Sequence, residues 1–370
     1  MRKKVQKSVC IFGAYFMLEQ VNRLQTEIGN AIEAKDIEAI HQMRVASRRL
    51  RNALNYFKNC LPQKFAKEWQ NEIRKITHTL GAARDLDIQI ACLNELDDDS
   101  LEDKIRPGYK RLLLRLTQRR EKAQKKVIKN LIDLQENDLL TKMRQFLETL
   151  TANTDGIYLF TPSLYEKAFS AINENLEDFL SYQSDIYDPK NMEKLHAMRI
   201  AGKHLRYTLE LFAPIYKQAL LPHVQAMKEI QDLLGEIHDA DVWLGWLPKF
   251  IEQEKALIED YFGNTGPLRR LLPGFKHFAE NRTNHRQQQY NLFLSTWESL
   301  RSEKAWQSLR EIIQAPISVE DAVIHLAADE EFTPEDLPEA EDTSERTTGT
   351  SANESLPDTT ESTIPPKPNL

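Results

Sequence analysis

The amino-acid sequence predicts an all-α protein in which two pseudo-symmetric four-helix bundles, produced by internal duplication, surround a basic central cleft. Apolar residues recur at spacings of three and four over most of the chain, which is the period of an amphipathic helix. Glycine is scarce, with 12 residues in 370, and seven of the 16 prolines lie at or after Pro316. Two phrases also recur about 155 positions apart, which indicates a duplicated unit.

Prolines, glycines and an acidic run divide the chain into eight predicted helices. In the first half, breaks at Pro62 and at residues 97–99 separate helices over 8–34, 36–60, 63–96 and 101–149. In the second half, breaks near Pro189, Pro222 and 263–267 separate helices over 162–185, 190–217, 221–256 and 266–313. Residues 151–162 are expected to join the repeats. The predicted units are a first repeat over 1–155, a second over 156–315 and a tail over 316–370.

The first predicted helix begins like a secretion signal. Basic residues, Lys7 among them, precede an apolar run from Val9 to Leu18. No small-residue cleavage site follows, and the apolar spacing continues through Leu24 and Ile28, so we expect a helix of the first bundle instead of a cleaved leader. No stretch contains the roughly 20 apolar residues of a membrane span. The sequence therefore predicts a cytoplasmic protein with no membrane partner.

The second predicted helix of each half contains the same eleven-residue phrase. The sequence His41-Gln-Met-Arg44-Val-Ala-Ser-Arg48-Arg49-Leu-Arg51 recurs as His196-Ala-Met-Arg199-Ile-Ala-Gly-Lys203-His204-Leu-Arg206. At about 100° per residue, one histidine and three cations of each copy fall within roughly 80° of one another. The two cationic faces are His41, Arg44, Arg48 and Arg51, and His196, Arg199, Lys203 and Arg206, with Arg49 and His204 on the flanks. The opposite, apolar faces are Met43, Leu50, Leu54 and Phe57, and Met198, Leu205, Leu209 and Phe212.

These cationic faces have two interpretations. A charged helix face is often simply solvated. However, like charges three and four residues apart are mildly destabilising, and here they occur twice with no acid inside either phrase. We therefore favour a site that holds negative charge, with the two helices facing each other across the cleft.

A second phrase lies on the third predicted helix of each half. Leu80-Gly81-Ala-Ala-Arg84-Asp85-Leu-Asp87 recurs as Leu234-Gly235-Glu-Ile-His238-Asp239-Ala-Asp241. Arg84 and Asp87 share the apolar side of their helix, and so do His238 and Asp241. We expect these four residues to be partly buried, paired groups that orient neighbouring arginines.

The fourth predicted helices can be aligned through Pro107-Gly-Tyr-Lys-Arg and Pro273-Gly-Phe-Lys-His. A secondary group of anion-binding residues is expected here, on one face of each helix, or else these residues form a solvated face. The second copy carries fewer cations, so the cleft should be more basic on the first-repeat side. The residues are Arg115, Arg119, Lys122 and Lys126 in the first copy, and Arg282 and Arg286 in the second.

Charge is divided unequally along the chain. From Pro316 onward there are fourteen acidic residues and two basic ones, a net charge of −12. The remaining residues hold 47 basic and 42 acidic side chains, a net charge of +5, so the body is basic although the whole chain is acidic. The tail contains one aromatic residue, Phe332, and is expected to be disordered. It would act as a solubilising extension or, alternatively, as an anionic mimic that competes for the basic site.

The three cysteines, Cys10, Cys60 and Cys92, are widely spaced. Their number and spacing suggest neither a disulfide framework nor a zinc site, and they are typical of a reducing cytoplasm.

The paired phrases resemble those of the CHAD family, the conserved histidine α-helical domain, over residues 8–313. This resemblance implies two four-helix bundles around a basic cavity that binds inorganic polyphosphate, in some members at polyphosphate granules. It also implies that the eight residues of the two cationic faces contact the anion. Lys203-His204 stands where the family commonly has two arginines, and His238 replaces an arginine. No Glu-x-Glu-x-Lys signature of a fused triphosphate-tunnel domain is present, so we expect a stand-alone module.

Two other functions agree less well with the sequence. Single-stranded nucleic-acid binders interleave aromatic residues with cations, whereas Tyr56, Phe57, Tyr207 and Phe212 are predicted to lie off the cationic stripes. A metal-dependent phosphohydrolase could use His238 and Asp239, but no recognised metal-ligand spacing or nucleophilic triad occurs. Phosphoryl transfer to the histidines is a further alternative. We expect a non-catalytic protein with no metal and no cofactor.

Overall fold

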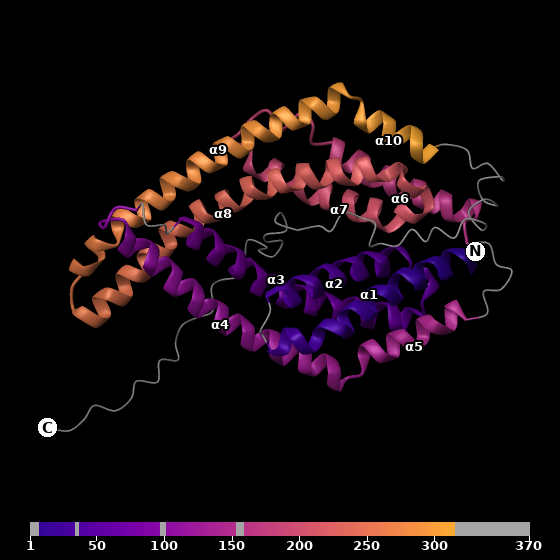
Figure 1. The fold of residues 1–370 in the computed structure, drawn as a ribbon, viewed down its shortest axis with the longest axis horizontal. Coiled ribbons are helices and arrows are strands. Elements are labelled where there is room, and N and C mark those ends of the chain that lie inside the picture. The colour runs from indigo at the N-terminus through magenta and orange to yellow at the C-terminus, as the bar shows by residue number, and fades with distance from the viewer. Residues whose placement is uncertain (1–6, 34–36, 97–100, 153–158, 315–370) are drawn as a thin grey trace.

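The computed structural model describes residues 7–33, 37–96, 101–152 and 159–314, which contain helices and no strand (Figure 1). The all-α prediction is confirmed. The helices are α1 (Lys7–Glu33), α2 (Ile37–Tyr56), α3 (Gln63–Leu96), α4 (Arg106–Glu136), α5 (Leu139–Thr151), α6 (Pro162–Leu180), α7 (Met192–Tyr216), α8 (Leu221–Phe262), α9 (Leu272–Ser302) and α10 (Ala305–Gln314). Within the described residues, three short 3₁₀ helices, η1 (Lys58–Cys60), η2 (Lys217–Leu220) and η3 (Gly266–Arg270), connect some of them. The predicted tail, residues 316–370, lies outside the described residues.

The predicted fourth helix of each half is in fact two helices. The first breaks at Asp138 and the second at Lys304, and both residues adopt a left-handed conformation with φ of 51° and 56°. Neither break contains glycine or proline, and the apolar spacing continues across both. The sequence therefore carries no signal that would end the helix there. α5 turns back to pack on α1, and α10 lies against α6 and α9 (Figure 1). Other helices differ from the prediction mainly at their ends; α8, for example, continues to Phe262 before Gly263 caps it at φ 70°.

Figure 1 shows the helices in two groups, α1–α5 and α6–α10. A large apolar core contains residues of both groups, including Met17, Leu54 and Phe212, whose side chains are fully buried. A smaller core lies where α4 and α9 begin, and it includes Tyr109 and Phe275. The two groups of helices are therefore joined through apolar contacts in two places. The internal duplication itself stays a prediction.

α4 and α9 cross at their first turns with almost no space between their backbones. A Cβ atom on Gly108 would lie 2.6 Å from the Leu271 carbonyl oxygen and 2.7 Å from the Gly274 Cα. Gly274 meets Gly108 in the same way, with its Cβ position 2.7 Å from the Gly108 Cα. These two glycines are the ones aligned in the sequence through the Pro-Gly pairs. Glycine is required at both positions because any side chain would separate the helices.

The expectation that the cysteines form no disulfide is wrong for one pair. Cys10, near the start of α1, is bonded to Cys60 in η1, with the two Cα atoms 5.2 Å apart, while Cys92 is in no disulfide. α1 and α2 pack against each other as consecutive helices joined by a short connection, which brings the start of α1 to the end of α2. The 50-residue separation in sequence conceals this proximity. The cysteines therefore no longer support a reducing compartment.

Nothing in the described ranges has both the length and the apolar character of a membrane-crossing helix. α1 instead belongs to the core, where Phe12, Met17 and Val21 are buried. The helix expected at the N-terminus is thus confirmed as part of the first group.

Candidate anion-binding site

α2 and α7 carry the repeated phrase, and their apolar faces are packed as predicted. The side chains of Met43, Leu50, Leu54 and Phe57 are 0 % exposed, and so are those of Met198, Leu205, Leu209 and Phe212. Each helix is thereby held by its apolar back, which fixes the direction in which the opposite face points.

The predicted cationic residues are far more buried than a solvated face would be. On α2, His41, Arg44, Arg48 and Arg49 are at most 9 % exposed. On α7, Arg199, Lys203 and Arg206 are at most 6 % exposed. His196 is half-buried, and Arg51 and His204 are exposed. The solvated-face interpretation is therefore wrong for most of these residues, and the cations are enclosed between helices more than an open cleft would allow.

Ion pairs bring the two rows of cations together at Glu210. The carboxylate of Glu210, on α7, lies 3.2 Å from Arg49 Nε on α2 and 3.5 Å from Arg206 Nε on its own helix. The Glu210 residue is only 4 % exposed. Sequence reasoning missed it, although Glu210 follows Arg206 by four residues and so lies on the same helix face. The corresponding position of the first half is Asn55, so the acid belongs to one row alone.

Tyr207 also joins the two rows. The guanidinium carbon of Arg48 lies 5.2 Å from the centre of the Tyr207 ring, and that of Arg206 lies 5.3 Å from it. The prediction that Tyr207 lies off the cationic stripe is wrong. At 100° per residue it is only about 40° from Lys203, so the periodicity contained this signal. Phe57 and Phe212 do lie in the core, as predicted.

Arg74, on α3, is a further cation near this site. Loss of surrounding water, followed by the positive charges of Arg74 and Arg44, lowers the pKa of the Arg51 guanidinium. Arg74 lies just before the Leu80-Gly81 phrase, and the matching position of the second half is also basic, Lys228. A basic residue at the same position of both halves was the sequence signal that could have identified Arg74.

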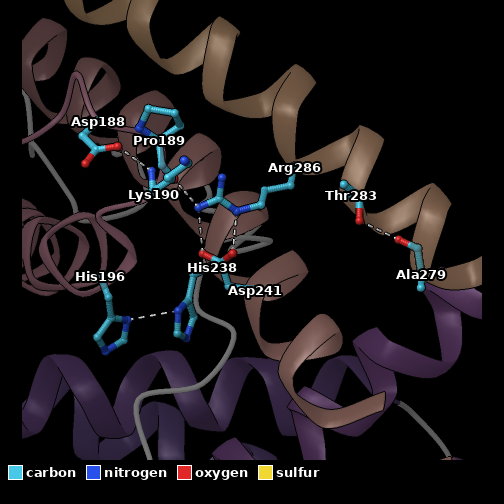
Figure 2. A network of polar contacts seen from close by, with 9 residues as sticks. All are labelled: Asp188, Pro189, Lys190, His196, His238, Asp241, Ala279, Thr283 and Arg286. Atoms are coloured by element: carbon cyan, nitrogen blue, oxygen red, sulfur yellow. Dashed lines mark hydrogen bonds and ion pairs between the residues drawn. The ribbon is translucent and has the colours of Figure 1, made fainter. Parts of the chain in front are cut away.

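His196 and His238 form a pair between α7 and α8 (Figure 2). Their Nδ1 atoms are 3.1 Å apart and the rings are stacked with centres 4.2 Å apart. Burial, followed by the charges of Arg199 and Lys203, lowers the pKa of His196. His238 of the second Leu-Gly phrase thus contacts the histidine of the second cationic phrase.

The two carboxylates predicted to orient arginines do so, with arginines from the fourth predicted helices. Asp87 accepts a hydrogen bond of 2.5 Å from Arg120 Nε on α4. Asp241 accepts hydrogen bonds of 2.5 and 3.3 Å from Arg286 on α9, whose Nη2 also donates to the Pro189 carbonyl (Figure 2). Burial raises the pKa of both aspartates, and the paired arginine opposes that shift in each case. Arg84 adds a weaker favourable charge near Asp87.

Between α3 and α8 lies a small cavity. Asp85, Cys92, Asp239 and Trp243 are among the residues that line it. Asp85 and Asp239 occupy the same position of the two Leu-Gly phrases, so these phrases approach each other as the cationic phrases do.

The family model for the CHAD domain matches residues 16–248 of this chain. The chain belongs to the CHAD family. The fold is also similar to that in the crystal structure of the CHAD domain from the plant Ricinus communis, with a TM-score of 0.50 and 21 % identity, covering 84 % of this chain and 92 % of that chain. At this identity the likeness shows the fold alone. No curated protein is significantly similar in sequence.

In this CHAD protein the secondary cations have varied surroundings. Arg115 donates to Glu254 on α8 at 2.5 Å, and Arg119 lies 5.0 Å from the ring centre of Trp246. Arg282 is buried and contacts the Cys92 sulfur at 3.3 Å. Arg286 is held by Asp241, as described above. Lys122 and Lys126 are exposed. Arg115, Arg119 and Arg286 thus have structural partners, and only the two lysines resemble a solvated face.

No group of three His, Cys, Asp or Glu side chains suited to a metal ion occurs in the part of the CHAD protein that the structure describes.

Proposed function

We propose that this CHAD protein binds inorganic polyphosphate at the cations of α2 and α7, without catalysis. The observation that carries the proposal is the meeting of two cation rows, 155 residues apart in sequence, at one interface. Arg48 of the first row and Arg206 of the second share the ring of Tyr207. Membership of the CHAD family and the buried set of cations support the same conclusion.

The chemistry of the ligand suits this arrangement. Polyphosphate is a flexible chain with a negative charge on each phosphate unit and no bases. Arginine is the preferred partner for such a ligand because its planar fork can donate two parallel hydrogen bonds to one phosphate. Helices hold these forks on a rigid backbone, so little ordering is required of the protein on binding. The exposed Arg51 and His204 provide positions that the ligand reaches first.

The experiment is a titration of the full chain with polyphosphate of defined lengths at several salt concentrations. Affinity should fall steeply with salt, because each neutralised phosphate releases condensed counterions. A variant with Arg44, Arg48, Arg199 and Lys203 reversed in charge should lose binding, with a milder glutamine version in case the reversal prevents folding. The matched control makes the same charge reversal, or the same glutamine changes, at four exposed lysines elsewhere, Lys64, Lys67, Lys110 and Lys125. A folded site variant that binds as well as this control would overturn the assignment.

Two further parts of the proposal have their own tests. We propose that the protein does not cleave polyphosphate, so incubation with Mg²⁺ or Mn²⁺ should release no phosphate; release that is lost on changing His238 or Asp239 would contradict this. We also propose a cytoplasmic location at polyphosphate granules. A fluorescent fusion should follow granules in cells and become diffuse when the cations of α2 and α7 are removed.

A further inference from the structure

Tyr207 is the one aromatic ring placed between the two cation rows by contacts of the described residues on both sides. Its helix, α7, supplies Arg206, and the facing helix, α2, supplies Arg48. Both guanidinium groups lie within the range in which a cation is attracted by the face of an aromatic ring. The ring therefore holds two like-charged side chains near one point, which their mutual repulsion would otherwise oppose.

The hydroxyl group of Tyr207 differs from that of the neighbouring Tyr56. Tyr56 Oη lies 3.0 Å from Thr208 Oγ1 and accepts a hydrogen bond of 2.7 Å from Asn175. The Tyr207 hydroxyl is buried, and no hydrogen-bond partner for it exists among the described residues. A buried hydroxyl without a partner is costly and uncommon, and it calls for an explanation such as a ligand that completes it.

We infer that Tyr207 is a ligand-contacting residue of the polyphosphate site, whose hydroxyl donates a hydrogen bond to a phosphate oxygen held between Arg48 and Arg206. This inference rests on the proposed function. The phenol supplies an O–H donor without adding charge, at the point where the two cation rows meet.

The arrangement also favours a phosphate chain over a nucleic acid. Single-strand binders use aromatic faces as platforms for bases. Here two guanidinium groups already lie over the ring of Tyr207, so a base would compete with them for it. The hydroxyl and the guanidinium edges are groups that phosphate oxygens can use.

The test is a comparison of two single variants of the full chain, Tyr207→Phe and Tyr216→Phe. Both tyrosines lie on α7, and both hydroxyl groups are buried without a hydrogen-bond partner in the described structure. Tyr216 lies nine residues further along, about 13 Å at 1.5 Å per residue, with its ring 5.8 Å from that of Tyr165. It therefore controls for the general effect of removing such a hydroxyl.

Tyr207→Phe should weaken the binding of a medium-length polyphosphate about tenfold, the usual size for a hydrogen bond to a charged group. The slope of affinity against salt should stay unchanged because no charge is lost. Thermal stability without ligand should not fall in either variant, and Tyr216→Phe should bind like the wild type.

The outcomes separate the two claims. If the wild type binds and Tyr207→Phe binds equally well, the role of the hydroxyl is overturned and the proposed function stands. If the two variants weaken binding alike, the effect is not specific to Tyr207 and the inference also fails. A wild-type chain that does not bind polyphosphate overturns the proposed function and this inference together.

Discussion

Glu210 is a carboxylate in an otherwise cationic set of residues. Its removal should lower the stability of the fold but raise the affinity for polyphosphate. Glu210→Gln keeps the shape of the side chain but releases the charges of Arg49 and Arg206. Removing one partner of a buried pair costs about 3–5 kcal/mol, and the retained amide should reduce this to about 2 kcal/mol. Polyphosphate affinity at low salt should rise several-fold. Urea unfolding and a binding titration measure the two effects.

The control for this change is Glu177→Gln. Glu177 pairs with Arg310 at 2.7 Å, but both side chains are well exposed, so the expected loss is below about 1 kcal/mol. If Glu210→Gln lowers stability while affinity does not increase, Glu210 only holds the helices together.

The histidines of the second cation row should make affinity depend on pH. Burial, with the charges of Arg199 and Lys203, lowers the pKa of His196. The pKa of His204 is also lowered: although part of its side chain is exposed, loss of water to the neighbouring groups is the largest cause, opposed by Asp178 and reinforced by Arg51 and Lys203. Both side chains are therefore neutral at pH 7 in the free protein. A bound polyanion favours the protonated forms and so raises both pKa values.

Binding should consequently take up protons, and affinity should increase as the pH falls from about 7 toward 5. The gain in affinity ends at the pH where the histidines of the free protein are also protonated. Because their pKa values are lowered, this pH lies below the ordinary value near 6.5. Calorimetry in buffers of different ionisation enthalpy measures the uptake. The double variant His196→Asn, His204→Asn should show a flatter pH dependence; an unchanged profile would assign the effect to other groups.

The sequence predicts the surroundings of some residues better than those of others. The apolar backs of α2 and α7 follow from the helical period, and the structure buries all of them. Tyr207 and Glu210 lie beside the cation face on the same helical wheel, so the sequence contains a signal for both. The partners of Asp87 and Asp241 could not be read from the sequence, because Arg120 and Arg286 approach only when α4 packs on α3 and α9 packs on α8.

At the scale of elements, the crossing of α4 and α9 should be intolerant of any side chain. Gly108→Ala would place a Cβ atom 2.6 Å from the Leu271 carbonyl oxygen and 2.7 Å from the Gly274 Cα, both backbone atoms that cannot rotate away. Separating the helices should cost about 2–3 kcal/mol, the usual range for overpacking. Gly29→Ala in α1 is the control, since nothing lies within 4 Å of its Cβ position. That change should stabilise the helix by up to about 1 kcal/mol; a loss as large as that of Gly108→Ala would contradict the crossing.

The disulfide ties α1 to the end of α2, so its reduction should lower stability. The bond closes a loop between residues 50 apart, for which loop entropy gives roughly 2–4 kcal/mol. The double variant Cys10→Ser, Cys60→Ser should lose this amount in urea unfolding, and dithiothreitol should then have no further effect on it. Cys92→Ser is the control, because Cys92 is not part of the disulfide. Thiol counting must find one free thiol in the oxidised chain; three free thiols would exclude the bond.

Most helices were predictable from the apolar spacing, but two of the breaks between helices were not. Of the ten α-helices in the described ranges, eight correspond to predicted ranges, while α5 and α10 arise from breaks at Asp138 and Lys304. A left-handed residue at an ordinary amino acid leaves no compositional mark, so the breaks depend on the packing of α5 on α1 and α10 on α6. Similarly, the disulfide depends on how α1 and α2 pack against each other. The spacing of the cysteines in the sequence does not reveal that packing.

Across the whole molecule, an acidic chain of net charge −7 brings buried arginines of two helix groups to one interface. Charge alone would allow either polyphosphate or a nucleic acid to bind there. The aromatic side chains agree better with the proposed polyphosphate ligand, because Phe57 and Phe212 are buried in the core, Tyr56 is hydrogen-bonded to Thr208, and two guanidinium groups lie over Tyr207. A single strand would therefore gain contacts from its phosphates but little from stacking, which contributes about 1–3 kcal/mol per base in proteins built for it.

Single-stranded DNA of matched phosphate number should accordingly displace labelled polyphosphate only at concentrations at least about tenfold higher, at the same salt and pH. Polyphosphate has the closer spacing of charges, so the difference should persist for homopolymers of thymine and of adenine alike. A preference between these two strands would indicate stacking on an aromatic surface. Displacement by DNA at concentrations equal to those of unlabelled polyphosphate would show that the interface reads negative charge alone, and the assignment to polyphosphate would then be wrong.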